Sequence, residues 1–374
     1  MFTQKTGIII SAAAIFFLAA QCDSTSTTGS GSGPGSGENS DNWLIDQDKF
    51  RRGASKDAIA SIENPGFVEV SQVAYMQPDD YVAAVMIDGT VKAYPYRIMD
   101  WHEIVNDKIG DTHFAFTYCP LTGSALAWDR TYEGEPVDFG VSGLLLNNNL
   151  VAYDRETDSY WSQMLMKSVA HERAGEQTEQ IDVFETQWRT FKRLYPEADF
   201  LARSGTGFNF RYAEQRVYGD YRNDHDRILY PLESLDSASQ GAGAPHRLPG
   251  KTVVHGIVGD QEHQAYPVNR FPASITVHHD RLGDSGYVIV GSDSLSFATS
   301  FRRTLNGNEL TFEAVQDQYP AVMRDQSGNL WDVFGRAVSG PDEGARLEPT
   351  RSYNAYWFAW NAFWPQTTVK VDVN

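Results

Sequence analysis

The chain has 374 residues, 41% of them hydrophobic and 13% aromatic, so it can bury a substantial core in one large domain or two smaller ones. Its 9 Trp, 18 Tyr and 20 Phe exclude a chain that is disordered throughout. Acidic residues outnumber basic residues by 49 to 31, and the net charge of -18 argues against nucleic acid as a partner, because phosphate contacts need Lys and Arg. The single apolar stretch, at the N-terminus, excludes a protein with several membrane spans.

Residues 1–22 have the features of an export signal. Lys5 supplies a positive charge, and residues 7–20 form an apolar run that is too short for a comfortable membrane span. The run Leu-Ala-Ala-Gln-Cys that ends at Cys22 resembles a lipoprotein signal, in which the cysteine is acylated and becomes the new N-terminus. The alternative is an ordinary secretory signal with an incidental cysteine.

Residues 23–42 contain only Ser, Thr, Gly, Asp, Asn, Glu and one Pro, and such a segment behaves as a disordered, flexible tether. We therefore expect a globular domain that is anchored in a membrane of the cell envelope through lipid on Cys22, facing the periplasm or the cell exterior. Cys119 then has no disulfide partner in the mature chain, because the sequence contains only two cysteines.

The first folded segment, residues 60–200, is predicted to be mainly β-structure. Residues 82–87 and 90–94 predict a hairpin, because Asp88-Gly89 favours the positive φ values of a tight turn. Further strand-length runs cover residues 113–118, 125–129, 137–141 and 150–153. Trp188, Phe191 and Tyr195 have helical spacing, and Pro196 ends that helix.

Residues 245–366 repeat the landmarks of the first segment after an irregular connection over residues 201–244. The matched landmarks are residues 93–97 with 265–270, 106–111 with 279–284, Gly134 with Gly307, Phe139 with Phe312, Trp161 with Trp331, and 188–196 with 357–365. The separation stays close to about 170 residues throughout. We expect an α+β fold that is mainly β, with two similar β-rich halves from an internal duplication, each closed by one aromatic-rich helix.

Three reactive side chains of the first half have different counterparts in the second. The pairs are His102 with Ile275, Glu103 with Thr276, and Cys119 with Ser292. Residues that build a fold should occur in both copies, whereas residues that perform chemistry need occur in only one. The candidate site therefore lies in the first half, around His102 and Cys119.

The sequence around these residues resembles the bacterial family catalogued as domain of unknown function 3179. The runs that carry the resemblance are residues 101–107, 117–125, 141–144, 149–151, 153–155, 161–163, 218–221 and 247–249. The resemblance covers roughly residues 60–366. It implies no settled activity. Many members carry Cys-Pro-Leu-Cys where this chain has Cys119-Pro-Leu-Thr122, and the resemblance therefore implies that no thiol–disulfide cycle can run within the motif here.

Two hypotheses give Cys119 and His102 a chemical role. In the first, both bind copper or zinc, with Glu103, His113 or an Asn of residues 147–149 completing the site. In the second, His102 activates Cys119 as a nucleophile, and Glu103 or Asp154 orients the imidazole. Both hypotheses require the two side chains to meet in an open pocket.

The residues expected around such a site are Glu103, Asn149, Asp154 and Arg155. Glu103 should face away from His102, because neighbours on an extended segment point to opposite sides. A third hypothesis is a non-catalytic binding or scaffold module that takes a glycan, peptide or other partner in the cleft between the halves. In that case Cys119 is a small buried hydrophobe and His102 a structural residue.

Overall fold

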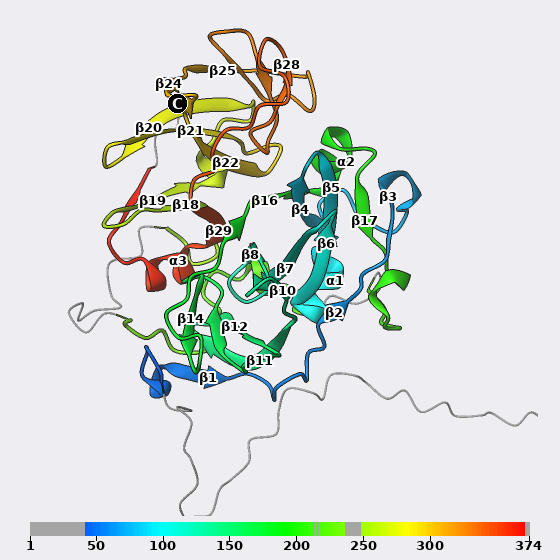
Figure 1. The fold of residues 1–374 in the computed structure, drawn as a ribbon, viewed down its shortest axis with the longest axis vertical. Coiled ribbons are helices and arrows are strands. Elements are labelled where there is room, and N and C mark those ends of the chain that lie inside the picture. Colours follow the sequence, from blue (N-terminus) through cyan, green and yellow to red (C-terminus); the bar gives the residue numbers. More distant parts are fainter. Residues whose placement is uncertain (1–41, 213, 215–216, 236–247, 371–374) are drawn as a thin grey trace, which may run out of the picture. The chain divides into compact units, whose positions relative to one another are not determined.

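The computed structural model describes residues 42–212, 214, 217–235 and 248–370, so the predicted signal with Cys22 and nearly all of the tether lie outside the described residues. The described residues are mainly β-structure, as predicted, and include three α-helices (Figure 1). None of their helices combines the length and apolar character needed to cross a membrane.

The Asp-Gly turn produces the hairpin expected from the sequence. Strands β4 (Tyr81–Ile87) and β5 (Thr90–Pro95) pair antiparallel, and Asp88 and Gly89 between them have φ values of 49° and 82°. This hairpin is the centre of a five-stranded sheet with the order β16-β4-β5-β17-β3. The other strands of that sheet are β16 (Val183–Gln187), β17 (Asp199–Leu201) and β3 (Phe67–Glu69).

Two further sheets complete the first half. One has the order β15-β8-β7-β6-β2, with β15 (Gln180–Ile181), β8 (Ser124–Asp129), β7 (Thr112–Cys119), β6 (Ile104–Ile109) and β2 (Ile62–Glu63). The other has the order β1-β11-β12-β13-β14, with β1 (Phe50–Arg52), β11 (Phe139–Leu146), β12 (Asn149–Asp154), β13 (Tyr160–Ser162) and β14 (Lys167–Ala170). A small ribbon pairs β9 (Thr131–Tyr132) with β10 (Glu135–Pro136). The strand predicted over residues 137–141 is thus displaced toward the C-terminus.

The second half contains strands with the same pairing order. Its sheets run β29-β18-β19-β30, β20-β21-β22 and β25-β26-β27-β28, with the ribbon β23-β24. Their bounds are β18 (Val253–Val258), β19 (His263–Pro267), β20 (Thr276–Leu282), β21 (Ser285–Ser292), β22 (Phe297–Arg302), β23 (Thr304–Leu305), β24 (Asn308–Glu309), β25 (Phe312–Ala314), β26 (Met323–Asp325), β27 (Leu330–Trp331), β28 (Ala337–Ser339), β29 (Ser352–Tyr356) and β30 (Thr367–Val369). Both β5 with β17 and β19 with β30 pair parallel, whereas the neighbouring pairs are antiparallel.

An aromatic helix follows the same strand in each half. Helix α2 (Trp188–Leu194) follows β16, and helix α3 (Trp357–Phe363) follows β29. A third helix, α1 (Tyr96–His102), was not expected from the sequence. Five short 3₁₀ turns complete the regular structure of the described residues: η1 (Gln47–Lys49), η2 (Val70–Gln72), η3 (Ser204–Thr206), η4 (Tyr221–Asn223) and η5 (Val268–Arg270).

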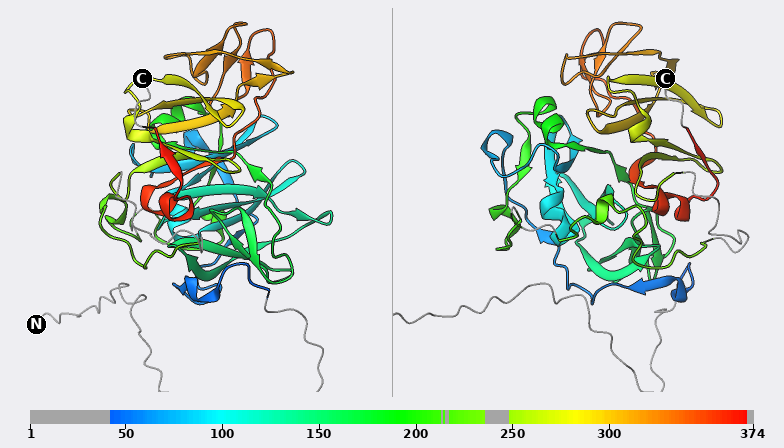
Figure 2. Two further views of the ribbon diagram at one scale, coloured as in Figure 1. Left: turned by 90° about the vertical axis from the view of Figure 1, so that its left-hand side faces the viewer. Right: turned by 180° about the vertical axis from the view of Figure 1, so that it is seen from behind.

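The two halves share their hydrophobic cores. Trp357 and Trp360 of α3 belong to a buried cluster that includes Trp161 of the first half, so α3 packs with the green strands of that half (Figure 2). Trp188 of α2 belongs to another buried cluster that includes Trp331 of the second half. Each helix therefore buries its aromatic face in a core built by both halves, which holds them together and leaves a cavity at their junction.

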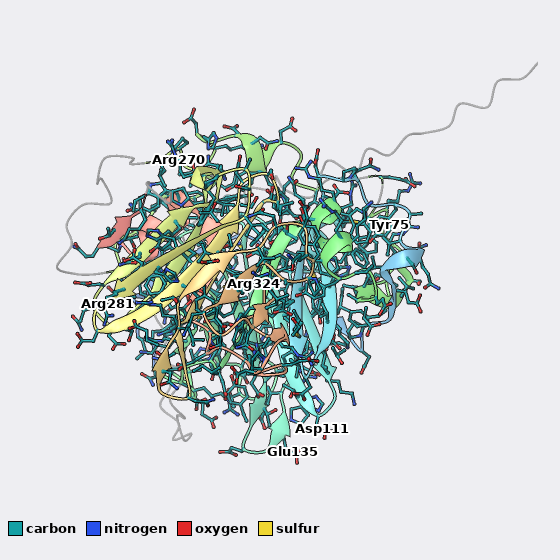
Figure 3. The ribbon with its side chains drawn as sticks, turned by 90° about the horizontal axis from the view of Figure 1, so that it is seen from above. Tyr75, Asp111, Glu135, Arg270, Arg281 and Arg324 are labelled. Carbon is teal, nitrogen blue, oxygen red and sulfur yellow. The ribbon has the colours of Figure 1, made fainter. Side chains whose placement is uncertain are left out.

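The exposed turns that carry Arg281 and Asp111 do not line this cavity. Arg281, near the end of β20, and Asp111, in the turn after β6, lie at different margins of the view in Figure 3. Both residues are exposed.

Candidate functional site

Cys119 ends β7 and lies in the hydrophobic core. Its side chain is 1% exposed and belongs to the buried cluster that also holds Trp128 and Tyr356. The thiol donates a hydrogen bond of 3.5 Å to the carbonyl oxygen of Asn148. Burial raises the pKa of the thiol to about 11, and the nearby carboxyl of Glu103 contributes in the same direction. The sulfur is therefore a protonated thiol at neutral pH, which is a poor nucleophile and a poor metal ligand.

A buried polar network holds the turn that follows Cys119. The Asn149 side chain donates to Gln163 Oε1 at 2.6 Å and to Thr122 Oγ1 at 3.0 Å. Gln163 donates in turn to Thr117 Oγ1 at 2.9 Å. Asn149 thus fixes the shape of the turn, because its amide satisfies polar groups that are fully buried. Thr122, which lies in this turn, is part of the network.

His102 is fully buried at the end of α1, and both of its ring nitrogens have partners. Nδ1 lies 2.7 Å from the carbonyl oxygen of Ala60, and Nε2 lies 2.6 Å from the hydroxyl of Tyr212. Burial lowers the pKa of the imidazole, against the opposing effect of the Ala60 hydrogen bond. His102 is therefore a neutral side chain that connects α1 to two other segments.

The backbones that carry His102 and Cys119 run alongside each other, but the structure does not join their side chains. Tyr118 N donates to Glu103 O at 2.7 Å, which places the two segments side by side. No hydrogen bond among the described residues connects Cys119 with His102. Nor do three or more His, Cys, Asp or Glu side chains in the described part of the chain converge as metal ligands would.

Glu103 does not continue an extended segment, contrary to the expectation. It follows the last residue of α1 with a positive φ of 59°, so the alternation of a strand does not apply to it. Its carboxyl is buried close enough to influence the Cys119 thiol. Burial raises the pKa of this carboxyl to about 8, and Asp100 adds to the shift.

Asp154 and Arg155 stabilise local structure. Asp154 accepts a hydrogen bond of 2.9 Å from the indole nitrogen of Trp161 and one of 2.7 Å from Thr157 N. Arg155 forms an ion pair of 3.0 Å with Asp57 near the surface. Within the part of the chain that the structure describes, neither side chain hydrogen-bonds to Cys119 or His102, so the structure does not group them with the predicted site.

A cavity lies where the two halves meet. Its volume is about 440 Å³, which is within the range of small-molecule sites. The lining residues come from both halves and from the connection between them: Tyr81, Tyr96, Gly123, Glu185, Arg222, Asn223, His225, Lys251, Thr252, Val253, Val268, Asn269, Asp293, Ser296, Asn354 and Tyr356. A second hollow of about 290 Å³, lined by residues 177–182 and 349–351, is more open and has no aromatic side chain.

Gly123 connects the cavity to the Cys119 turn. The ring of Tyr356 lies so close to Gly123 that an added Cβ would be 2.6 Å from the ring, so the position accepts no side chain. Tyr356 N also donates to Thr122 O at 2.7 Å. The turn after Cys119 therefore forms part of the cavity wall, while the sulfur itself lies behind it.

The Lys251 amine is the most unusual group in this wall. Lys251 is only 3% exposed, and its Nζ has no hydrogen-bond partner among the described residues. Nζ lies 3.2 Å from the ring centroid of Tyr221, 4.7 Å from that of Phe358 and 5.2 Å from that of Tyr356. Burial lowers the pKa of the amine to about 7, against the opposing effect of Asp224.

Arg222 and Glu185 are ionisable groups that line the cavity together with His225 and Asp293. The guanidinium of Arg222 is held 2.6 Å from Asp100 and lies over the ring of Tyr96. Glu185 is 6% exposed and accepts a hydrogen bond from the Tyr96 hydroxyl. Burial raises the pKa of Glu185 to about 8, although the Tyr96 hydrogen bond opposes the shift. The cavity therefore contains a fixed cation, a carboxyl that is protonated at neutral pH, and a titratable amine.

Sequence reasoning missed these residues, although a signal for some of them was present. Several cavity residues of the first half have second-half counterparts that also line the cavity: Tyr81 with Val253, Tyr96 with Val268, Gly123 with Ser296, and Glu185 with Asn354. The same comparison that singled out Cys119 would have singled out Glu185. Arg222 and Lys251 lie in the connection and have no counterpart to compare.

A family model described as "Protein of unknown function (DUF3179)" matches residues 56–367. The chain belongs to this family. The matched segment includes both halves and the connection between them, and therefore every residue that lines the cavity. Comparison with curated proteins and with solved structures finds no similar chain.

Proposed function

We propose that this DUF3179 protein is an envelope-anchored binding protein that holds a small polar molecule in the cavity between its halves. The observation that carries the proposal is the Lys251 amine, which is buried in the cavity wall without a hydrogen-bond acceptor among the described residues. A buried donor that lacks an acceptor costs about 1–3 kcal/mol. A ligand oxygen that accepts a hydrogen bond from Nζ would recover this free energy.

Arg222 and the tyrosines of the cavity favour an anionic ligand with a polar body, although the wall also contains Asp293. Arg222 supplies a permanent positive charge. Tyr81, Tyr96 and Tyr356 offer flat apolar surfaces with hydroxyl groups, and Asn354 offers an amide. A small carboxylic acid that carries hydroxyl or carbonyl oxygens fits this set of groups.

We also propose how the cavity between the halves arose. We infer that the halves arose by internal duplication, which their common strand order supports. The cavity then lies at the junction of two equivalent surfaces that have diverged. The first half contributes Tyr81, Tyr96 and Glu185, and the second contributes valines and Asn354 at the matching positions. A ligand would therefore meet different side chains on the two sides of the cavity and would bind in one orientation.

Equilibrium binding of defined carboxylates tests the function. Lactate and succinate are titrated into the purified protein by calorimetry, with a thermal-unfolding assay in parallel. We expect at least one of them to bind and to raise the melting temperature. Lys251→Met should weaken that binding by at least about tenfold, because a hydrogen bond to a charged ligand is lost.

Lys108→Met is the matched control, since Lys108 is an exposed lysine on β6. It should leave the affinity unchanged. Equal affinities of wild type and Lys251→Met, with both proteins folded, would contradict the proposed site. The absence of any heat or thermal shift with either carboxylate would contradict the proposed ligand class.

A further inference from the structure

The Lys251 amine can do more than donate hydrogen bonds. We propose that Lys251 captures a small 2-oxo acid covalently, by forming an imine between its Nζ and the keto carbon. The inference rests on the proposed function, because it uses the same cavity. It adds an activity to that function and narrows the ligand to acids with a carbonyl group next to the carboxylate.

The surroundings of Nζ favour an uncharged, nucleophilic amine. Nζ is buried, faces aromatic rings and has no hydrogen-bond acceptor among the described residues, so little stabilises an ammonium ion apart from the rings and Asp224. Arg227, which is close enough to affect it, disfavours the charge. Desolvation of this kind activates lysines that attack carbonyl groups.

Two other residues in the cavity wall can bind the carboxylate of the acid and protonate its keto oxygen. Arg222 presents a guanidinium that can bind the carboxylate of the acid. Glu185 is buried beside Tyr96 and keeps its proton at neutral pH, so it can act as an acid toward the departing oxygen. An amine, an acid and an anion-binding group thus line one small cavity.

The reaction is a condensation that needs no oxidant or reductant. The Nζ lone pair attacks the keto carbon, a carbon–nitrogen bond forms, and the electrons of the carbonyl π bond move to oxygen. Glu185 donates a proton to that oxygen, which leaves as water when the carbon–nitrogen double bond forms. Glu185 regains its proton from the amine nitrogen, and the second amine hydrogen passes to the same oxygen, so the water carries one proton from Glu185 and one from the amine.

Reductive trapping tests the inference. The full protein is incubated with pyruvate and sodium cyanoborohydride at pH 7, and lysine modification is mapped by peptide mass spectrometry. We expect the peptide with Lys251 to gain the mass of pyruvate less one oxygen. Modification of Lys251 should be at least about tenfold faster than that of Lys108, because an exposed lysine is almost fully protonated at this pH.

Variants and a second carbonyl compound separate a specific site from background chemistry. Lys251→Met should remove the rapid adduct, and Glu185→Gln should slow it. Acetone, which has the same ketone but no carboxylate, should label Lys251 more slowly than pyruvate. An unmodified Lys251 peptide, or labelling no faster than at Lys108, would overturn the inference. If lactate still binds in that case, the proposed binding function stands without the covalent step.

Discussion

Cys119 illustrates how burial decides the chemistry of a single side chain. Its position in the most recognisable motif of the chain directs attention to the sulfur. The structure surrounds it with apolar groups and the Asn148 carbonyl, and these surroundings favour the neutral thiol. Gly123 and Tyr356 line the neighbouring cavity, whereas Cys119 does not.

Native Cys119 is expected to be unreactive toward thiol reagents. With a thiol pKa of about 11, the thiolate fraction at pH 7.5 is about two orders of magnitude below that of a free cysteine. We expect the native Cys22→Ser protein to react slowly with Ellman's reagent. The same protein should react fast when it is unfolded in about 6 M urea, because the thiol is then exposed. Rapid modification of the native protein would instead favour the cysteine-dependent enzyme.

Glu185 should make the protein less stable as pH rises. Its pKa is about 8 in the folded protein and near 4.5 when exposed, so the folded state binds its proton more tightly. The stability from this group is present below pH 4.5 and is lost as pH rises through 8. We expect Glu185→Gln to flatten the decrease in unfolding free energy over this range, measured by urea denaturation.

Glu103 contributes a decrease of the same sign, since its pKa is also about 8, so some pH dependence will remain in Glu185→Gln. The exposed Glu313 provides the control, and Glu313→Gln should follow the wild-type curve. Identical pH profiles for Glu185→Gln and wild type would show that Glu185 is not held in its protonated form.

At the scale of elements, the same turn recurs after β12 and β26. Asp154 accepts a hydrogen bond from the indole of Trp161 at 2.9 Å, and Asp325 accepts one from Trp331 at 3.0 Å. Both carboxylates also accept backbone N–H groups of their turns. The repeated arrangement fixes a buried tryptophan in the next strand of each half.

Asp154→Ala and Asp325→Ala should therefore destabilise the protein to a similar degree. Each leaves a buried indole N–H unpaired, which costs about 1–3 kcal/mol. Chemical denaturation measures the change, with Asp284→Ala at an exposed turn as the control. A large loss for one variant and none for the other would indicate that the two turns do not have equivalent roles.

For the whole molecule, the important feature is that the halves share their cores. The aromatic helix of each half belongs to a cluster with residues of the other. The cavity depends on this packing, because Glu185 and Asn354 reach it from β16 and β29 of different halves. A site of this kind exists only when both halves are folded together.

Anchoring is expected to hold this unit at a membrane. If Cys22 is lipidated, the wild-type protein should sediment with membranes, and Cys22→Ser should remain unprocessed. Cell fractionation followed by mass spectrometry of the N-terminal peptide distinguishes the forms. Recovery of cleaved, unmodified wild-type protein in the soluble fraction would contradict the lipid anchor.

The sequence by itself determined the features that depend on neighbouring residues. The Asp88-Gly89 turn and the aromatic helix after Gln187 follow from backbone preferences and periodicity, and the matching landmarks of the two halves are visible without coordinates. Helix α1 was not predicted, because no proline follows it to mark its end, as Pro196 does for α2. Its presence changed the surroundings of both His102 and Glu103.

Only the tertiary structure decided which groups form the candidate site. Lys251 and Arg222 come from the irregular connection, where no local pattern marks them, and they meet Glu185 only because the halves pack against each other. The protonation states of Cys119, Glu185 and Lys251 were equally inaccessible to sequence reasoning. Burial sets them, since a low-dielectric surrounding favours the neutral form of each group, and burial is a property of packing between distant segments.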